Sequence, residues 1–234
     1  SRNQNPKILS MGQLSERLKD AQFYGILDSG YVSRADMYSK CSQLINAGTK
    51  IIQLRAKLQT HSQRREIALE ILPLFQRECA PFFVINDDAE LAASLPGAGL
   101  HIGQDDIPPA AARKIIGGGR VLGLSTHSIE QAKSADALNG ILDYFAVGPV
   151  FATNTKPGRP AVGLELVSSV ADFKPCLPWF AIGGINKSTA RKVRSAGAER
   201  IVAVSDVLVP QDTTGAIRDL MAEFRGYRTD SAKI

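Results

Sequence analysis

Residues 23–30 read FYGILDSG, and this stretch decides the fold. Its apolar run predicts a buried strand, which the polar turn Asp28-Ser29-Gly30 follows. An open, doubly wound α/β sheet usually carries a glycine-rich fingerprint at this place, directly after its first strand. The turn lacks that fingerprint, so the segment favours a different α/β architecture.

Outward from this stretch, strand-like runs alternate with helix-like segments along the whole chain. The predicted strands are Phe23–Asp28, Ile51–Arg55, Phe82–Ile85, Gly99–Ile102, Val121–Leu124, Asp143–Val147, Trp179–Ile182 and Ile201–Val204. The predicted helices run from Ser33 to about Ala47, from Ser62 to about Cys79, from near Asp87, Pro108, Ser128, Glu165 and Ser188, and from about Thr213 to Phe224. Eight such units in 234 residues predict a single closed (β/α)8 barrel, the TIM barrel, with its site on the loops that follow the strands.

Composition and length restrict the class of protein. Hydrophobic residues make up 44% and charged residues 22%, which is typical of a globular protein. No apolar run approaches the ~18 residues of a membrane helix, and residues 1–20 lack the apolar stretch of a secretory signal. We therefore expect a cytoplasmic protein with a polar extension over residues 1–20, one barrel over 21–226 and a tail over 227–234.

The distribution of charge argues against a nucleic-acid partner. The net charge is +5, of which +2 lies in residues 1–20 and +2 in residues 225–234, both expected to be frayed tails. A nucleic-acid binder normally carries its basic residues as a stripe on the folded surface. We expect small-molecule partners, neither nucleic acid nor membrane; a homo-oligomer is compatible with the sequence.

The three cysteines, Cys41, Cys79 and Cys176, lie far apart and are odd in number. They form neither a metal-ligand spacing nor an even disulfide framework. We expect them to be small buried side chains in a reducing compartment.

Polar side chains alternate along the second predicted strand. Gln53, Arg55 and Lys57 are separated by apolar residues, so an extended chain places all three on one face. An amide and two cations in a row suit a multiply charged anion. An edge strand with a solvated face would show the same pattern.

Pairs of acidic residues follow the third and fourth strands. Asp87-Asp88 comes after Asn86, and Asp105-Asp106 comes after the strand that ends at Ile102. Adjacent carboxylates repel one another, and oxygen ligands without His or Cys indicate Mg²⁺ rather than zinc. The alternative for each pair is capping of the next helix.

Two later loops have the composition of a phosphate site. Thr153, Thr155 and Lys156 lie in a loop flanked by glycine and proline, and Gly183-Gly184 follows the seventh strand. In many barrels the loops after strands seven and eight offer backbone N–H groups to phosphate, although a glycine pair is also common in simple turns.

The fifth strand leads into Ser125, Thr126 and His127, and Ser128 is a predicted helix cap. Ser125 and His127 then face the mouth of the barrel or its core. We expect His127 to be structural, His101 to hydrogen-bond in the core and His61 to lie on the surface.

Together these motifs resemble the thiamine phosphate synthase family. The matching segments, in chain order, are residues 53–57 (QLRAK), 85–88 (INDD), 101–106 (HIGQDD), 123–127 (GLSTH), 148–156 (GPVFATNTK), 181–185 (AIGGI) and 204–205 (VS). The resemblance covers roughly Phe23 to Phe224. One departure is Ala56, where the family usually has an acidic residue; Ala56 is expected to face away from Gln53 and Arg55.

The resemblance implies an enzyme that joins an aminopyrimidine methyl diphosphate to a thiazole ethyl phosphate and releases pyrophosphate. It assigns the pyrimidine diphosphate to Gln53, Arg55, Lys57, Asn86, Ser125 and Lys156. It assigns Mg²⁺ to Asp87 and Asp106, and the thiazole phosphate to Thr153, Thr155, Gly184, Val204 and Ser205. Arg55, Lys57, Ser125 and Lys156 would assist the chemical step.

Two rival functions remain at this point. A thiazole tautomerase on the same barrel would use His127 as a base and would not need the diphosphate-binding residues. A catalytically silent barrel would bind a phosphorylated ligand as a sensor. The joint presence of Gln53, Asn86, Asp87 and Asp106 argues against the tautomerase.

Overall fold

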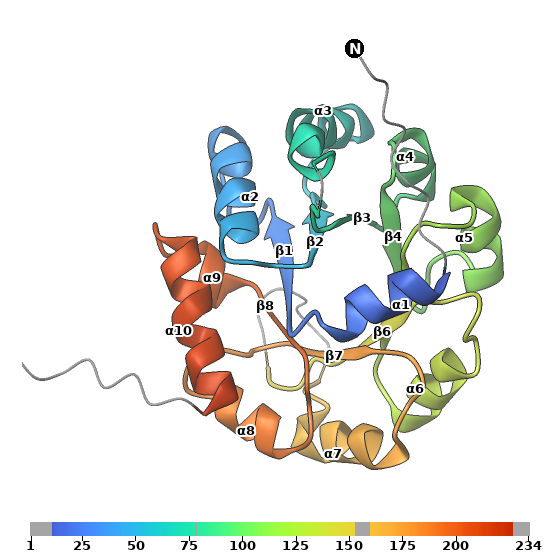
Figure 1. Ribbon diagram of the computed structural model, residues 1–234, viewed down its shortest axis with the longest axis vertical. Coiled ribbons are helices and arrows are strands. Elements are labelled where there is room, and N and C mark those ends of the chain that lie inside the picture. The colour runs from blue at the N-terminus through green and yellow to red at the C-terminus, as the bar shows by residue number, and fades with distance from the viewer. Residues whose placement is uncertain (1–10, 78, 153–159, 227–234) are drawn as a thin grey trace, which may run out of the picture.

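The computed structural model describes residues 11–77, 79–152 and 160–226, and eight parallel strands form its centre (Figure 1). They close into a barrel in chain order, since β8 pairs with β1 as well as with β7. The strands are β1 (Phe23–Asp28), β2 (Ile51–Arg55), β3 (Phe82–Asn86), β4 (Gly99–Ile102), β5 (Leu122–Thr126), β6 (Tyr144–Val147), β7 (Trp179–Ile182) and β8 (Ile201–Ala203). The predicted barrel is confirmed, with strand ends shifted by one or two residues.

Helices surround the barrel as a ring. They are α2 (Met37–Asn46), α3 (His61–Ile71), α4 (Ala89–Ser94), α5 (Pro109–Ile116), α6 (Ile129–Asp136), α7 (Gly163–Phe173), α8 (Ala190–Ser195), α9 (Ser205–Leu208) and α10 (Thr213–Arg225). Within the described residues, none of these helices is long and apolar enough to cross a bilayer.

The second predicted helix differs from the observed one at both ends. Thr60, rather than a residue near Ser62, caps α3 in a capping box with Gln63. The α-helix ends at Ile71 and gives way to a 3-10 turn over Leu72–Phe75, where Pro73 has no N–H to donate. A helix through Cys79 was therefore too long.

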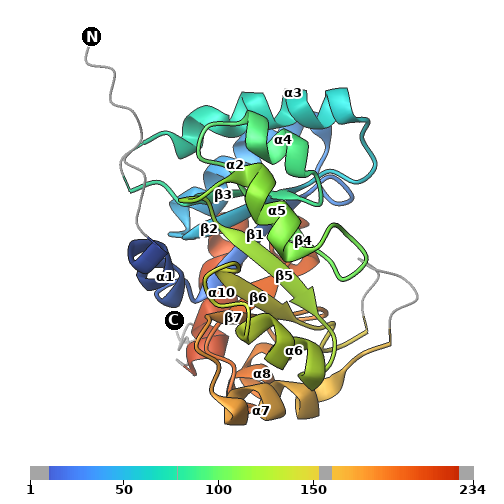
Figure 2. The ribbon, with the colours of Figure 1, turned by 90° about the vertical axis from the view of Figure 1, so that its right-hand side faces the viewer.

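Part of the predicted N-terminal tail is a packed helix, α1 (Met11–Lys19). Its Leu14 and Leu18 are buried and belong to one apolar cluster with side chains of the barrel interior, among them Tyr144 and Phe180. Figure 2 shows α1 at the end of the barrel where the strands begin, opposite the arrowheads. The expectation of a frayed segment is wrong for residues 11–19, because two leucines four residues apart bury one face of the helix.

Side chains on alternate strand positions divide between two apolar layers. The larger layer lies between the strands and the helix ring, and it contains Leu27, Leu54 and Ala56. The smaller fills the barrel and contains Tyr24, Ile26 and Ile51. Ala56 thus faces the helices and not the barrel mouth, as its alternation with Arg55 predicts.

Candidate active site

A cavity of about 400 Å³ opens at the C-terminal ends of the strands. Seven predicted site residues line it together: Gln53, Arg55, Asn86, Ser125, Gly184, Val204 and Ser205. Lys57, Asp87 and Asp106 lie beside it and contact one another. The predicted ligands Thr153, Thr155 and Lys156 lie outside the described residues.

Arg55 is fixed by a buried carboxylate that the sequence reading did not assign. Its Nη1 lies 2.6 Å from Oδ2 of Asp28, which is only 1% exposed, and the other oxygen, Oδ1, accepts from the Gly30 N–H at 2.9 Å. Asp28 and Arg55 occupy paired positions on β1 and β2. The sequence feature that could have indicated this pair is Asp28 itself, an acidic residue at the end of the strand next to Arg55.

Lys57, Asp87 and Asp106 form a charged cluster at the rim. Lys57 Nζ lies 3.0 Å from Oδ2 of Asp87. Burial raises the pKa of Asp87, but the hydrogen bond and charge of Lys57, with a hydrogen bond from Asp106, bring it below its ordinary value. Burial and the charge of Asp87 raise the pKa of Asp106, although the Gly103 N–H opposes this. The two neighbouring carboxyl groups therefore have pKa values shifted in opposite directions, lower for Asp87 and higher for Asp106.

This pair has the donor chemistry that Mg²⁺ prefers. Mg²⁺ is usually bound through one or two carboxylates, with substrate phosphates and water completing its octahedron. Within the described part of the chain, no group of three or more His, Cys, Asp or Glu side chains could hold a metal. Asp87 and Asp106 fit an ion whose remaining ligands come from substrate and solvent.

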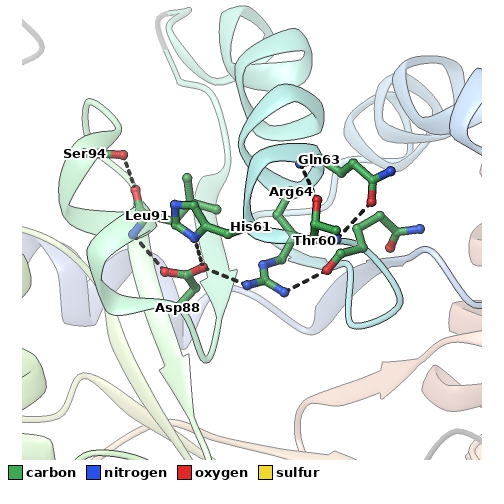
Figure 3. Close-up of polar contacts among 8 residues, drawn as sticks. Thr60, His61, Gln63, Arg64, Asp88, Leu91 and Ser94 are labelled. Carbon is green, nitrogen blue, oxygen red and sulfur yellow. Dashed lines mark hydrogen bonds and ion pairs between the residues drawn. The ribbon is translucent and has the colours of Figure 1, made fainter.

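Asp88 takes the other role considered for the acidic pairs, that of a helix cap (Figure 3). Its Oδ1 accepts from the Leu91 N–H at 3.0 Å, while Oδ2 contacts His61 and Arg64 of α3 at 3.0 and 3.3 Å. Asp87, by contrast, has a φ of 63°, a left-handed conformation that Asp tolerates better than most residues. Of these two adjacent residues, Asp88 therefore caps α4, whereas Asp87 belongs to the charged cluster with Lys57.

A hydrogen-bonded chain of side chains crosses the barrel interior below the cavity. Gln53 Nε2 lies 2.6 Å from Tyr24 Oη, and Tyr24 Oη lies 2.7 Å from Tyr144 Oη. His101 then links Tyr144 Oη to Ser125 Oγ, with both distances 2.9 Å. All five side chains are buried. Ser125 and His101 are therefore parts of one network, in which the sequence analysis had not placed either tyrosine.

The loop after β7 approaches the cavity closely because it contains two glycines. Gly184 has a φ of 64°, and a Cβ on it would lie 2.7 Å from the Cβ of Phe151. Only glycine fits this backbone, which lies against Phe151, and the Gly184 carbonyl accepts from the side chains of Asn186 and Thr189. Val204 and Ser205 border the same cavity at the junction of β8 and α9.

The other histidine and cysteine expectations have mixed outcomes. His127 lines the cavity, and its Nδ1–H donates to the Gly148 carbonyl at 2.5 Å, which gives it the structural contact expected of it. Cys41 is buried, but Cys79 and Cys176 are exposed, so the expectation of three buried thiols is wrong for two of them. Isolated cysteines carry no periodic signal that separates the two environments.

These features define the chain as a (β/α)8-barrel protein with cationic and carboxylate groups beside a cavity at the C-terminal ends of its strands. The family model described as thiamine monophosphate synthase matches residues 23–207, and the chain belongs to this family.

Relatives match over nearly the whole chain. A thiamine-phosphate synthase of Arthrobacter sp. (strain FB24) is 43% identical over 227 residues, which cover 88% of this chain and 94% of the relative. The thiamine-phosphate synthase of Mycolicibacterium smegmatis is 40% identical over 215 residues, with 88% and 93% covered. Among solved structures, the thiamine phosphate pyrophosphorylase of Pyrococcus furiosus is similar with a TM-score of 0.77 at 26% identity, covering 90% of this chain and 98% of that one.

Proposed function

We propose that the chain catalyses the thiamine-phosphate synthase reaction: an aminopyrimidine methyl diphosphate and a thiazole ethyl phosphate give thiamine phosphate and pyrophosphate. The chain is a transferase. Family membership supports the reaction, and the single structural observation that carries it is the gathering of seven predicted ligands around one cavity.

The two substrates divide the mouth between them. The pyrimidine diphosphate lies on the side of β2, β3 and β5 and is held by Gln53, Arg55, Lys57, Asn86 and Ser125, with Lys156. The thiazole phosphate lies on the side of β7 and β8 and is held by Gly184, Val204 and Ser205, with Thr153 and Thr155. The two loops after β7 and β8 are where phosphate commonly binds in barrels of this type.

The residues match a dissociative displacement. The bond between the pyrimidine methylene carbon and the diphosphate oxygen breaks, and the thiazole nitrogen donates its lone pair to the resulting cation. Negative charge grows on the departing oxygen, and Arg55 is already oriented for it by Asp28. The ring nitrogen attacks without losing a proton, so no general base is required.

Asp87 and Asp106 would hold Mg²⁺, which when bound supplies positive charge to the diphosphate and orients it. Lys57 contacts Asp87 in the structure and can turn its ammonium group to a phosphate oxygen instead. Because Lys57 lies beside the two carboxylates, its ammonium group stays at the end of the cavity where the diphosphate would lie.

A product assay tests the function. The purified chain, both substrates and Mg²⁺ should give thiamine phosphate and pyrophosphate in equal amounts. Turnover of the thiazole phosphate alone would instead indicate a tautomerase, and binding of either substrate without a product would indicate a sensor.

We also place the enzyme in the cytoplasm. Cys79 and Cys176 are exposed and free, and such thiols persist where the surroundings are reducing.

A further inference from the structure

The hydrogen-bonded chain inside the barrel has a direction, which follows from what each group can donate. The lone pair of Gln53 Nε2 is delocalised into the amide carbonyl, so this nitrogen only donates, and it donates to Tyr24 Oη. Tyr24 then keeps its own hydrogen for the one remaining neighbour in the chain, Tyr144 Oη at 2.7 Å. Tyr144 in turn donates to Nδ1 of His101.

The reverse direction leaves a buried donor unmatched. If Tyr144 donated to Tyr24, the Tyr24 hydrogen would point at an amide NH₂ that cannot accept it. An unmatched buried donor costs about 1–3 kcal/mol, which is enough to fix the direction. Burial raises the pKa of both tyrosines, so each keeps its hydrogen and can serve as a donor.

The direction determines the state of His101. Its Nδ1 accepts from Tyr144, so the imidazole hydrogen lies on Nε2 and is donated to Ser125 Oγ at 2.9 Å. Ser125 accepts that bond and lines the cavity, so its own hydroxyl hydrogen is left for a ligand. The chain begins at one predicted substrate-binding residue, Gln53, and ends at another.

Packing holds the chain in place. The Tyr144 ring lies against Gly123 of β5, where an added Cβ would be 2.0 Å from Cζ, so only glycine leaves room for it. His101 stacks on the same ring, with centroids 5.6 Å apart, and Tyr24 meets it edge-on at 5.6 Å. Neither hydroxyl can therefore turn to another partner without moving a packed ring.

We propose that the Tyr24–Tyr144 pair is a positioning device that holds His101 as its Nε2–H tautomer and makes Ser125 a hydrogen-bond donor toward the cavity. The group that Ser125 meets on the substrate is then an acceptor, such as a ring nitrogen or a diphosphate oxygen. The identity of that substrate rests on the proposed function, whereas the tautomer does not.

Nitrogen-15 NMR of the imidazole groups tests the tautomer directly. The chain has three histidines, and the His101 signals are assigned by their loss in His101→Asn. In the wild type we expect a protonated Nε2 and an unprotonated Nδ1. Tyr144→Phe removes the donor to Nδ1 and should give a mixture of both tautomers.

Tyr24→Phe is the matched control, because it removes the same atom one step earlier. Tyr144 still donates to His101 in this variant, so the His101 tautomer should stay as in the wild type. Thermal melts of both variants establish that each is folded at the temperature of the spectra. A wild-type His101 protonated on Nδ1, or equal shifts in both variants, would overturn the proposal.

Activity provides a second, separate readout. Tyr144→Phe and Ser125→Ala should each lower kcat/KM by about tenfold, the effect of losing one hydrogen bond to the substrate or to its support. The double variant should also lose about tenfold, because Tyr144 acts through Ser125. A loss near a hundredfold would mean that the two act independently and would contradict the proposed path. If the wild type makes no product, the proposed function fails while the NMR result still decides the tautomer.

Discussion

Asp28 influences the site from a position that a substrate would not reach. It is nearly inaccessible, yet it holds the guanidinium of Arg55 and the turn after β1 at the same time. Asp28→Asn keeps the shape and the bond to Gly30 but removes the charge opposite Arg55. We expect KM for the pyrimidine diphosphate to rise about tenfold, measured by steady-state kinetics, because Arg55 is no longer held in place.

The exposed ion pair between Arg34 and Glu70 provides the comparison. Both partners are more than a third exposed, so the pair contributes little. Glu70→Gln should leave KM unchanged and the free energy of unfolding within about 0.5 kcal/mol of the wild type. An Asp28→Asn variant with wild-type KM would show that Arg55 needs no carboxylate partner.

Asp87 and Asp88 are adjacent, but we expect substitution of Asp87 to lower turnover and substitution of Asp88 to lower stability. Asp87→Asn removes a proposed Mg²⁺ ligand and should lower turnover by about 100-fold, while thiazole phosphate binding measured by calorimetry survives. Asp88→Ala removes the cap of α4 and the contacts to His61 and Arg64. It should cost about 1 kcal/mol of stability and keep turnover. Equal turnover in the two variants would contradict the assignment of Asp87.

At the scale of the element, α1 stabilises the barrel by covering the end where the strands begin. Leu18 is fully buried there, whereas Lys19 beside it is exposed. Leu18→Ala should lower the free energy of unfolding by about 2–5 kcal/mol in urea denaturation. Lys19→Ala should change it by less than about 0.5 kcal/mol. Similar small effects at both positions would mean that α1 is only loosely attached.

The strands were predictable and α1 was not, for a physical reason. Each strand is a short apolar run between polar turns, so its existence is visible without knowledge of its neighbours. Helix α1 has only nine residues and a mostly polar surface. Its two leucines are buried only because they cover the open end of the barrel. That end exists only after β1 pairs with β8, so no local pattern in the sequence indicates it.

The site shows the same division. Gln53, Arg55 and Asn86 could be predicted to face the cavity because they are polar residues within or at the ends of otherwise apolar strands. Tyr24 and Tyr144 are separated by 120 residues and resemble ordinary core aromatics in the sequence. Their role depends on two hydroxyl groups meeting inside a closed barrel, which no local pattern records.

At the scale of the whole molecule, thiol reactivity should report the opening of the fold. Burial raises the pKa of Cys41 to about 12, while Cys79 and Cys176 are exposed. At pH 8 we expect a thiol reagent to modify two cysteines quickly and the third only as the barrel unfolds. Mass spectrometry of the labelled peptides measures this. Fast labelling of Cys41 in the native protein would show that α2 separates from the barrel far more readily than its packing suggests.

The packing of α1 also affects the path by which ligands reach the cavity. The end of the barrel where the strands begin is filled by an apolar cluster that includes Leu14, Leu18 and Phe180. The cavity opens at the other end, where the strands finish. In the described part of the structure, the substrates and products of the proposed reaction would then enter and leave at the strand tips. The substrate that binds deeper in the cavity would therefore bind first, and the product that lies deeper would be released last.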